Sequence, residues 1–168
     1  MKVNGKVKES HFSTELRKSC EAQGIFYYKI PDAFGMQRFS PKKPFDAIII
    51  YRGKAICIEN KLDKSVNSFN FNKIKGHQYE GLQKAKDSGA ECFFFINHRN
   101  KKTNKIYITD VKRIQELSKD LPSIQYGWLA DYCWAVLEKI KNPNGKGRIW
   151  DIKRFCSIIF RESNNENS

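Results

Sequence analysis

The sequence predicts one α/β domain in which a central mixed β-sheet is flanked by helices. Runs of β-branched and aromatic residues with the length of strands occur at 45–51, 54–61 and 91–97. Stretches with the periodicity of amphipathic helices occur at 10–23, 77–88 and 111–119. Helices that alternate with strands are typical of a sheet that is covered on its faces. With 168 residues, of which 40% are hydrophobic, the chain can form one buried core.

The N-terminal segment predicts a helix followed by a strand. Ser10 is expected to cap a helix that runs to about Gln23 and that Gly24 ends. Apolar side chains recur along this helix at every fourth residue and predict its buried stripe. Glu15 flanks the stripe, so it either reaches toward the sheet or lies exposed to solvent. Residues 25–30 follow as the first strand.

The next two strands form a predicted β-hairpin. The segments 45–51 and 54–61 are both apolar and β-branched, and the turn Arg52-Gly53 separates them. Side chains alternate across a strand, so Glu59 and Lys61 point to the same side of the second strand. Antiparallel pairing about the turn brings Asp46 alongside Glu59.

This arrangement predicts a metal site. Two carboxylates side by side repel each other unless a cation lies between them, and oxygen ligands suit Mg²⁺ or Mn²⁺. A nearby lysine can orient a water molecule or neutralise a phosphoryl oxygen, so the residues are those needed for metal-dependent hydrolysis of a phosphodiester. The alternative is a surface hairpin whose charges are only solvated.

The segments Pro44-Phe45-Asp46 and Glu59-Asn60-Lys61 resemble the motif of the PD-(D/E)xK nucleases. Within that superfamily the chain is most similar to the Holliday junction resolvases of the archaeal and bacterial RecU types, over roughly residues 10–97. The resemblance implies a restriction-endonuclease-like fold and an Mg²⁺-dependent homodimer, with Mn²⁺ able to substitute, that resolves four-way DNA junctions by paired symmetric nicks. The residue Phe45 between proline and aspartate departs from the adjacent Pro-Asp of the family, and Asn60 is polar where the family pattern expects a buried side chain.

The resemblance also assigns roles to individual residues. Asp46, Glu59 and an acidic residue on the first helix, here Glu15, are expected to hold the metal. Lys61 is expected to position the attacking water or help to deprotonate it. A glutamine early in the next helix, as in the RecU branch, corresponds to Gln78.

The charge of the chain predicts a polyanionic partner. The formal net charge is +13, the pI is about 9.6, and the basic residues are spread along the whole sequence. A membrane surface is the competing interpretation, but no segment approaches the roughly 20 apolar residues of a membrane span, and the N-terminus lacks the apolar core of a signal peptide. We therefore expect DNA as the partner and no membrane.

Two polar segments around the hairpin supply the expected DNA contacts. They lie before the first motif strand and between Lys61 and the next helix. Within the second segment, Phe69 and Phe71 either wedge against bases at a distorted junction or pack in the core. The residues predicted to contact DNA are Arg38, Lys42, Lys43, Lys64, Lys73, Lys75 and His77.

Cysteine and histidine usage predicts no zinc site. The five cysteines include no C-x-x-C pair and several lie in apolar runs, which is typical of reduced, buried thiols in a cytoplasmic protein. The histidines likewise lack metal-ligand spacing. Each of the three is expected to contact phosphate or to be solvated.

The second half of the chain is less clearly patterned. The strand 91–97 is uniformly apolar and is expected at the centre of the sheet, and 105–109 follows as another strand. Asp110 is expected to cap the helix 111–119. The segment 128–140 has a helical pattern, and 149–160 is apolar enough to pack on the domain.

The large aromatic residues of this half, Trp134, Trp150 and Phe155, either cover the sheet or contact a partner subunit. We expect the domain to occupy 1–162 and the polar segment 163–168 to be a disordered tail.

Two other functions fit the same sequence. A related nuclease that acts on DNA ends, nicks or specific sites has the same motif residues. A non-catalytic DNA-structure-binding protein that retains the fold is the other alternative. The paired carboxylates Asp46 and Glu59 argue against it, because without metal they repel phosphate.

Overall fold

The computed structural model describes residues 8–32 and 42–165, with side chains described as far as 161. Its centre is a six-stranded sheet in the order β1-β2-β3-β5-β6-β8. The β3–β5 pair is parallel, and the other neighbouring pairs are antiparallel, so the predicted mixed sheet is confirmed. The strands are β1 (Phe26–Lys29), β2 (Ala47–Tyr51), β3 (Lys54–Asp63), β5 (Glu91–Arg99), β6 (Asn104–Asp110) and β8 (Ala135–Leu137).

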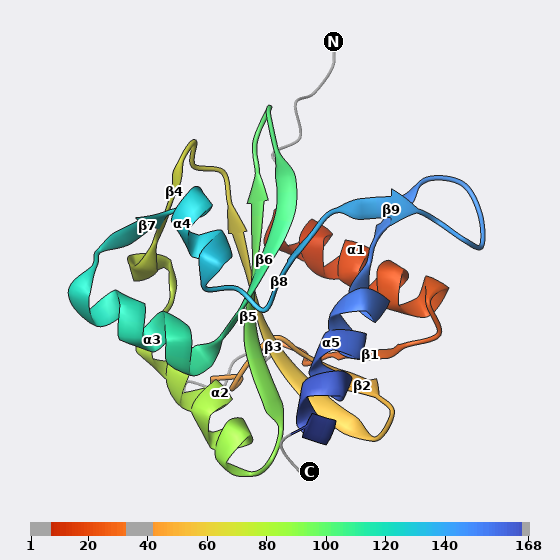
Figure 1. Ribbon diagram of the computed structural model, residues 1–168, viewed down its shortest axis with the longest axis horizontal. Helices are drawn as coiled ribbons and strands as arrows, with labels where there is room; N and C mark the ends of the chain where they lie inside the picture. The colour runs from red at the N-terminus through yellow and green to blue at the C-terminus, as the bar shows by residue number, and fades with distance from the viewer. Residues whose placement is uncertain (1–7, 33–41, 166–168) are drawn as a thin grey trace.

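Helices cover both faces of the sheet (Figure 1). The helices α1 (Glu9–Ala22) and α5 (Ile152–Asn165) lie on one side. On the other side are α2 (Gly76–Asp87), α3 (Val111–Asp120) and α4 (Tyr126–Asp131). Among the described helices, every one is too short or too polar to span a bilayer.

Short elements complete the fold. The strand β4 (Ser68–Asn70) pairs with β7 (Ser123–Gln125), and the 3₁₀ helix η1 (Phe71–Lys73) follows β4 directly. The strand β9 (Lys139–Lys141) forms a hairpin with β10 (Arg148–Trp150).

The sheet separates two hydrophobic cores, as its alternating side chains require. Alternate residues of β3 belong to different cores: Ile56 and Ile58 pack under α1 and α5, and Cys57 packs under α2. β5 is buried on both faces, which confirms its predicted central position. Trp150 and Phe155 are fully buried against the sheet, so they cover the sheet rather than a partner subunit.

Several local predictions are confirmed. β2 and β3 form an antiparallel hairpin about Arg52-Gly53. Gly24 and Gly89 follow α1 and α2 with positive φ angles of 68° and 96°, which glycine adopts without steric cost. Asp110 caps α3, and its Oδ1 accepts a hydrogen bond from the Lys112 N–H at 2.7 Å.

The first helix begins earlier than predicted. Lys8 is the N-cap, and Ser10 lies inside the first turn of α1, where its carbonyl oxygen accepts a hydrogen bond from Thr14 Oγ1. The capping preference of serine is overridden because His11 accepts a hydrogen bond from the Lys8 N–H instead.

The predicted helix 128–140 is wrong beyond Asp131. The chain leaves α4, and the N–H of Trp134 donates to the carbonyl of Ile108, which starts the pairing of β8 with β6. The free edge of β6 therefore determines the structure of this segment. The predicted tail also begins too early, since α5 continues to Asn165, while 166–168 lie outside the described residues.

Phe69 and Phe71 are buried in the core beneath α2 and α3, so of the two alternatives core packing is confirmed and a wedge against bases is excluded. Their rings meet edge to face with centroids 5.9 Å apart. The described cysteines are unpaired, as predicted, and four of the five are buried.

Candidate active site

The hairpin β2–β3 brings the motif carboxylates together. Ala47 is the register partner of Ile58, and the N–H of Asp46 donates to the Ile58 carbonyl at 3.0 Å, so Asp46 lies opposite Glu59. Asp46 Oδ2 accepts a hydrogen bond from the Asn60 N–H at 2.9 Å. Both carboxylates are nearly inaccessible to solvent. The predicted side-by-side placement is confirmed.

Glu59 is held by two partners that point to the same oxygen. Lys61 Nζ lies 3.1 Å from Glu59 Oε1, and the side-chain amide of Gln78 donates to that oxygen as well. Burial of the carboxyl and the negative charge of Asp46 raise the pKa of Glu59 to about 7, while Lys61 opposes this shift. The ionised form of Glu59 is therefore disfavoured unless a further positive charge lies beside it.

Gln78 reaches Glu59 because α2 packs very closely on the motif segment. Its Oε1 accepts from the Lys75 N–H at 2.8 Å, which fixes the amide at the start of the helix. One turn later, a Cβ on Gly81 would overlap the backbone of Pro44. Only glycine permits this contact, and the contact sets the distance between Gln78 and the hairpin.

Lys43 binds the other carboxylate. Its Nζ lies 2.7 Å from Asp46 Oδ1 and 2.7 Å from Asp32 Oδ1. These two carboxylates raise the pKa of Lys43 against the opposing effect of desolvation. A divalent cation at Asp46 therefore competes with the Lys43 ammonium for Oδ1.

The polar residue within the E-x-K motif, Asn60, is buried on the opposite side of β3. Its Nδ2 donates to Ser13 Oγ of α1 at 3.3 Å. This bond, together with the backbone bond to Asp46, ties the first helix to the β2–β3 hairpin. Asn60, which is polar where the family pattern expects a buried side chain, thus has a hydrogen-bond partner in the fold.

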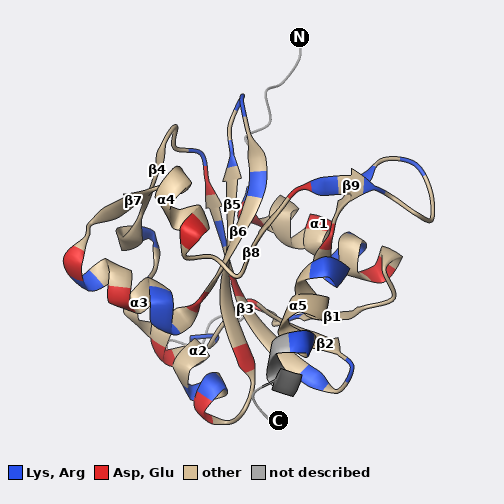
Figure 2. Cartoon of the chain, in the orientation of Figure 1, with Lys and Arg blue, Asp and Glu red and all other residues tan. Residues whose placement is uncertain are grey.

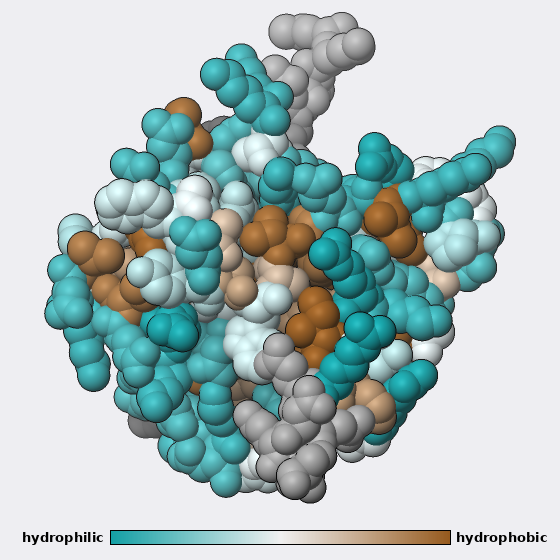
Figure 3. All heavy atoms as spheres, viewed as in Figure 1, coloured by the Kyte–Doolittle hydropathy of each residue, from teal (hydrophilic) through white to brown (hydrophobic). Residues whose placement is uncertain are grey.

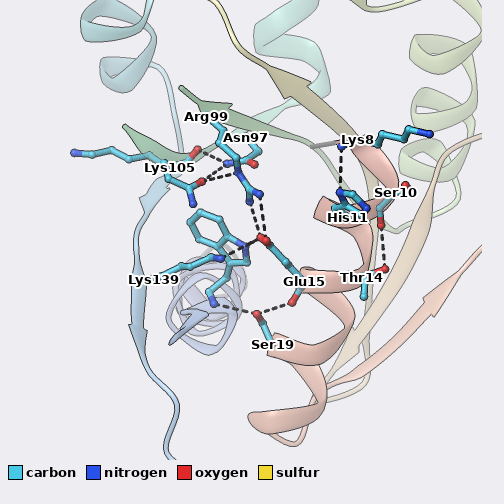
Figure 4. Close-up of polar contacts among 12 residues, drawn as sticks. Lys8, Ser10, His11, Thr14, Glu15, Ser19, Asn97, Arg99, Lys105 and Lys139 are labelled. Carbon is cyan, nitrogen blue, oxygen red and sulfur yellow. Dashed lines mark hydrogen bonds and ion pairs between the residues drawn. The ribbon is translucent and has the colours of Figure 1, made fainter. Parts of the chain in front are cut away.

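The structure does not bring Glu15 to the carboxylate pair. Figure 4 shows its carboxylate pointing instead toward Arg99, Lys139 and Trp150. Arg99 binds both oxygens, at 3.1 and 2.6 Å, and the Trp150 indole N–H donates at 3.2 Å. The positive charges of Arg99 and Lys139 lower the pKa of Glu15 despite its partial burial.

Glu9, an exposed residue in the first turn of α1, interacts electrostatically with Asp46 and Lys61, and the sequence analysis missed it. Desolvation and the charge of Asp46 raise its pKa, and Lys61 is the strongest opposing charge. A signal was present in the sequence. Glu9 is in helical phase with the buried residues Phe12 and Leu16, whereas Glu15 is out of phase with them.

The predicted DNA-contact residues have different environments. Lys42, Lys64 and Lys75 are exposed, His77 is half-buried, and Arg38 lies outside the described residues. Lys43 is bound to Asp46 as described above. Lys73 forms an ion pair with Asp63, so it is not a free phosphate contact.

Asp63 forms a buried network that the sequence analysis also missed. It accepts hydrogen bonds from Lys73, Tyr126 and Ser65, and these donors lower its pKa although burial opposes them. His98 stacks on Tyr126 with ring centroids 3.6 Å apart and is itself buried. The prediction that His98 is solvated or contacts phosphate is therefore wrong.

The donor set at the hairpin fits a hard cation that retains water. In the described part of the chain, no three His, Cys, Asp or Glu side chains come close enough to hold a metal ion by themselves. Mg²⁺ is commonly bound by only one or two protein carboxylates, with water and substrate phosphate completing its coordination. Asp46 and Glu59 provide that number, and their mutual repulsion favours a cation between them.

Comparisons with known proteins give the family of the chain. The family model of recombination protein U matches residues 34–143. A Holliday junction resolvase RecU of Mycoplasmopsis pulmonis (strain UAB CTIP) is 33% identical over 84 residues, which are 50% of this chain and 52% of the relative. The chain thus spans about half the length of that relative.

A solved structure also resembles the chain. The Holliday junction resolvase Hjc of Archaeoglobus fulgidus aligns with a TM-score of 0.46 and 17% identity, over 62% of this chain and 78% of Hjc. The family match extends from residue 34 to beyond β9 and includes the hairpin, α2 and the central strands. Because this match covers well over half of the 168 residues, the chain belongs to the recombination protein U family.

Proposed function

We propose that this protein is a metal-dependent endonuclease that resolves four-way DNA junctions by paired nicks. The observation that carries the proposal is the pair Asp46 and Glu59, held opposite each other with Lys61 and Gln78 bonded to Glu59. The relative's name, Holliday junction resolvase, supports the choice of substrate. The net charge of +13 supports a polyanionic substrate.

The chain's own residues prepare the reaction. Asp46 and Glu59 would hold Mg²⁺, or Mn²⁺ in its place, with Glu9 adding negative charge nearby. The bound ion would lower the pKa of a coordinated water and stabilise charge on the phosphate. Gln78 fixes the orientation of Glu59, and Asn60 fixes that of Asp46 through its backbone N–H.

Lys61 supplies a proton donor beside the carboxylates. Its ammonium is largely buried and bonded to Glu59. In the proposed reaction it orients the attacking water and donates a hydrogen bond to the phosphate oxygen that becomes more negative. The exposed lysines around the site, such as Lys42 and Lys64, attract the flanking phosphates.

A cleavage assay with four substrates tests the proposal. Duplex, forked, single-stranded and four-way junction DNA at equal concentration are incubated with the protein, with Mg²⁺ or with EDTA. We expect metal-dependent symmetric nicks in the junction. Preferential cutting of duplex ends or nicks would support the related-nuclease alternative, and junction binding with no cleavage under any metal would support a non-catalytic protein.

Variants assign the chemistry to the site. Asp46→Asn and Glu59→Gln are expected to abolish cleavage while DNA binding stays equal or becomes tighter, since each removes a metal ligand and a negative charge that repels phosphate. Lys61→Ala is expected to be inactive and still bind metal. Wild-type turnover in any of the three would contradict its assigned role.

A further inference from the structure

A basic groove lies near the edge of the sheet opposite β1. It has a volume of about 590 Å³ and lies among β8, the β9–β10 hairpin and the start of α5. Two acidic residues, Glu138 and Asp151, also line it. Its basic lining residues are Lys105, Lys139, Lys141, Arg148 and Arg154.

Positive charge is concentrated around this groove. The segments 99–105 and 138–154 together contain ten Lys and Arg but two Asp and Glu, whereas the whole chain has 31 and 18. Figure 2 shows Lys and Arg on the β5–β6 turn, on β9 and its following turn, and on the exposed side of α5. In Figure 3 the surface is indented between the β5–β6 turn and the β9–β10 turn. The groove thus lies in a basic part of a basic protein.

Two of the three acidic groups in or beside the groove form ion pairs: Glu138 pairs with Lys105 at 2.8 Å, and Glu15 pairs with Arg99 and Lys139. The third, Asp151, accepts a hydrogen bond from the Arg154 N–H at 3.2 Å. These ion pairs hold Arg99, Lys105 and Lys139 in place, and other described basic side chains remain unpaired. Lys141, Lys146 and Arg154 are exposed and have no carboxylate within ion-pair distance among the described residues.

The groove is also held in a fixed shape. The Arg148 guanidinium donates to the Lys139 carbonyl, with Nε at 3.1 Å, and so staples β10 to β9. The Lys139 ammonium lies 5.1 Å from the centre of the Trp150 ring. Glu15 then connects this hairpin to α1 and β5, as Figure 4 shows. Lys139 and Arg148 are thus held in place before a polyanion binds, so their ordering adds little to the entropy cost of binding.

We propose that this groove binds the sugar-phosphate backbone of a duplex DNA arm away from the cut, which rests on the proposed nuclease function. From β3 to β8 there are three strand spacings, about 14 Å in all at about 4.8 Å each. The groove therefore lies too far from Asp46 and Glu59 to act on the scissile phosphate. It contacts phosphates further along the substrate and positions the DNA relative to the carboxylate pair. Arg148 and Arg154 lie beyond residues 34–143, the segment that the family model matches.

A charge-matched pair of variants tests the groove. One protein, the groove variant, carries Lys141→Glu and Arg154→Glu in the groove and Lys146→Glu on the adjoining β9–β10 turn. The control carries Lys84→Glu, Lys112→Glu and Lys119→Glu, which are exposed positions on α2 and α3. Both variants have the same net charge, and circular dichroism and melting curves check that both are folded. Binding to a long-armed four-way junction and to linear duplex is measured in EDTA over a series of salt concentrations.

We expect the groove variant to bind both DNAs roughly tenfold more weakly or worse at about 0.1 M salt, and to flatten the slope of log affinity against log salt by about two to three. The control should change much less. Equal losses in the two variants, or a groove variant that binds like wild type, would overturn the proposal and leave the groove to another partner such as an acidic protein.

Cleavage separates this inference from the proposed function. At saturating protein with Mg²⁺, the groove variant should nick the bound junction at the wild-type rate, because its substitutions lie far from Asp46. If the wild type cleaves no DNA, the nuclease proposal fails. The binding comparison in EDTA still determines whether the groove binds DNA.

Discussion

At the scale of single residues, Glu59 couples folding to pH. Its pKa in the fold is about 7 against an ordinary value of 4.5, so the folded state binds the proton more tightly than the unfolded state. The contribution of Glu59 to the free energy of unfolding is fully present below about pH 4.5 and is lost as pH rises through about 7. The loss is up to ~3 kcal/mol, because a difference of one pH unit between the two pKa values corresponds to about 1.4 kcal/mol.

Denaturant unfolding in EDTA at pH 5 and pH 8 measures this effect. Wild type is expected to lose stability relative to Glu59→Gln over that interval, since the amide has no charge to bury. Glu116→Gln, an exposed position on α3, is the control and should follow wild type. Parallel profiles for wild type and Glu59→Gln would show that the carboxyl is not strained in the fold.

Glu9 and Glu15 are distinguished by what each carboxylate contacts. Glu9→Gln is expected to weaken Mn²⁺ binding several-fold in a calorimetric titration, because its charge lies near Asp46 and Lys61. Glu15→Gln should leave metal affinity unchanged and reduce stability by about 1–2 kcal/mol, since Arg99 and Lys139 lose their partner. If Glu15→Gln weakened Mn²⁺ binding and Glu9→Gln did not, Glu15 and not Glu9 would be the acidic residue of α1 that contributes to metal binding.

At the scale of elements, the contact between α2 and the motif segment controls the site. A methyl group at Gly81 overlaps the Pro44 backbone, so Gly81→Ala must push the helix away and carry Gln78 off Glu59. We expect a lower melting temperature and a cleavage rate at least tenfold lower. A tenfold lower rate corresponds to about 1.4 kcal/mol of lost transition-state stabilisation. Gly76→Ala, on the same helix with open space around its Cβ position, is the control and should retain activity. Normal cleavage by Gly81→Ala would mean that the site tolerates movement of α2.

The elements that could be predicted from the sequence are those fixed by local contacts. The β2–β3 hairpin depends on a two-residue turn and on side-chain alternation, so the positions of Asp46, Glu59 and Lys61 relative to one another followed from spacing alone. Gln78 was singled out by the family resemblance, and its amide is bonded to Glu59 in the structure.

Long-range packing decided the features that could not be predicted. The segment after Asp131 has a helical pattern, but it pairs with β6, which is remote in sequence. Glu15 is drawn to Arg99, 84 residues away, and no local pattern signals that partner. His98 of β5 was predicted to be polar surface because its stacking partner Tyr126 comes from α4, which is remote in sequence.

At the scale of the whole molecule, the proposed function requires two sites. A four-way junction has a two-fold axis, so a closed homodimer places one Asp46–Glu59 pair at each cut. From the sequence we expect the interface to include apolar surface of the C-terminal third, where Trp128, Trp134 and Trp150 lie. In the structure Trp150 is buried, so of these three the exposed Trp128 is the side chain most available for such a contact.

Mixed dimers test this arrangement. Wild type is combined with an excess of Asp46→Asn subunits, and the products from a four-way junction are separated on native and denaturing gels. We expect singly nicked junctions to accumulate while resolved duplexes decrease. Unchanged resolution, together with sedimentation as a monomer with and without DNA, would contradict the two-site mechanism and leave a general nuclease.

The position of Trp150 gives the protein a built-in optical reporter. Its indole is shielded from solvent, donates to Glu15 and lies beneath Lys139, whereas Trp128 is 64% exposed. Emission from the shielded ring occurs at shorter wavelength and resists quenching by iodide, so it can be separated from that of Trp128. A phosphate that approaches Lys139 changes the electric field across the Trp150 ring. Fluorescence of the unlabelled protein can therefore follow the occupation of the groove in real time.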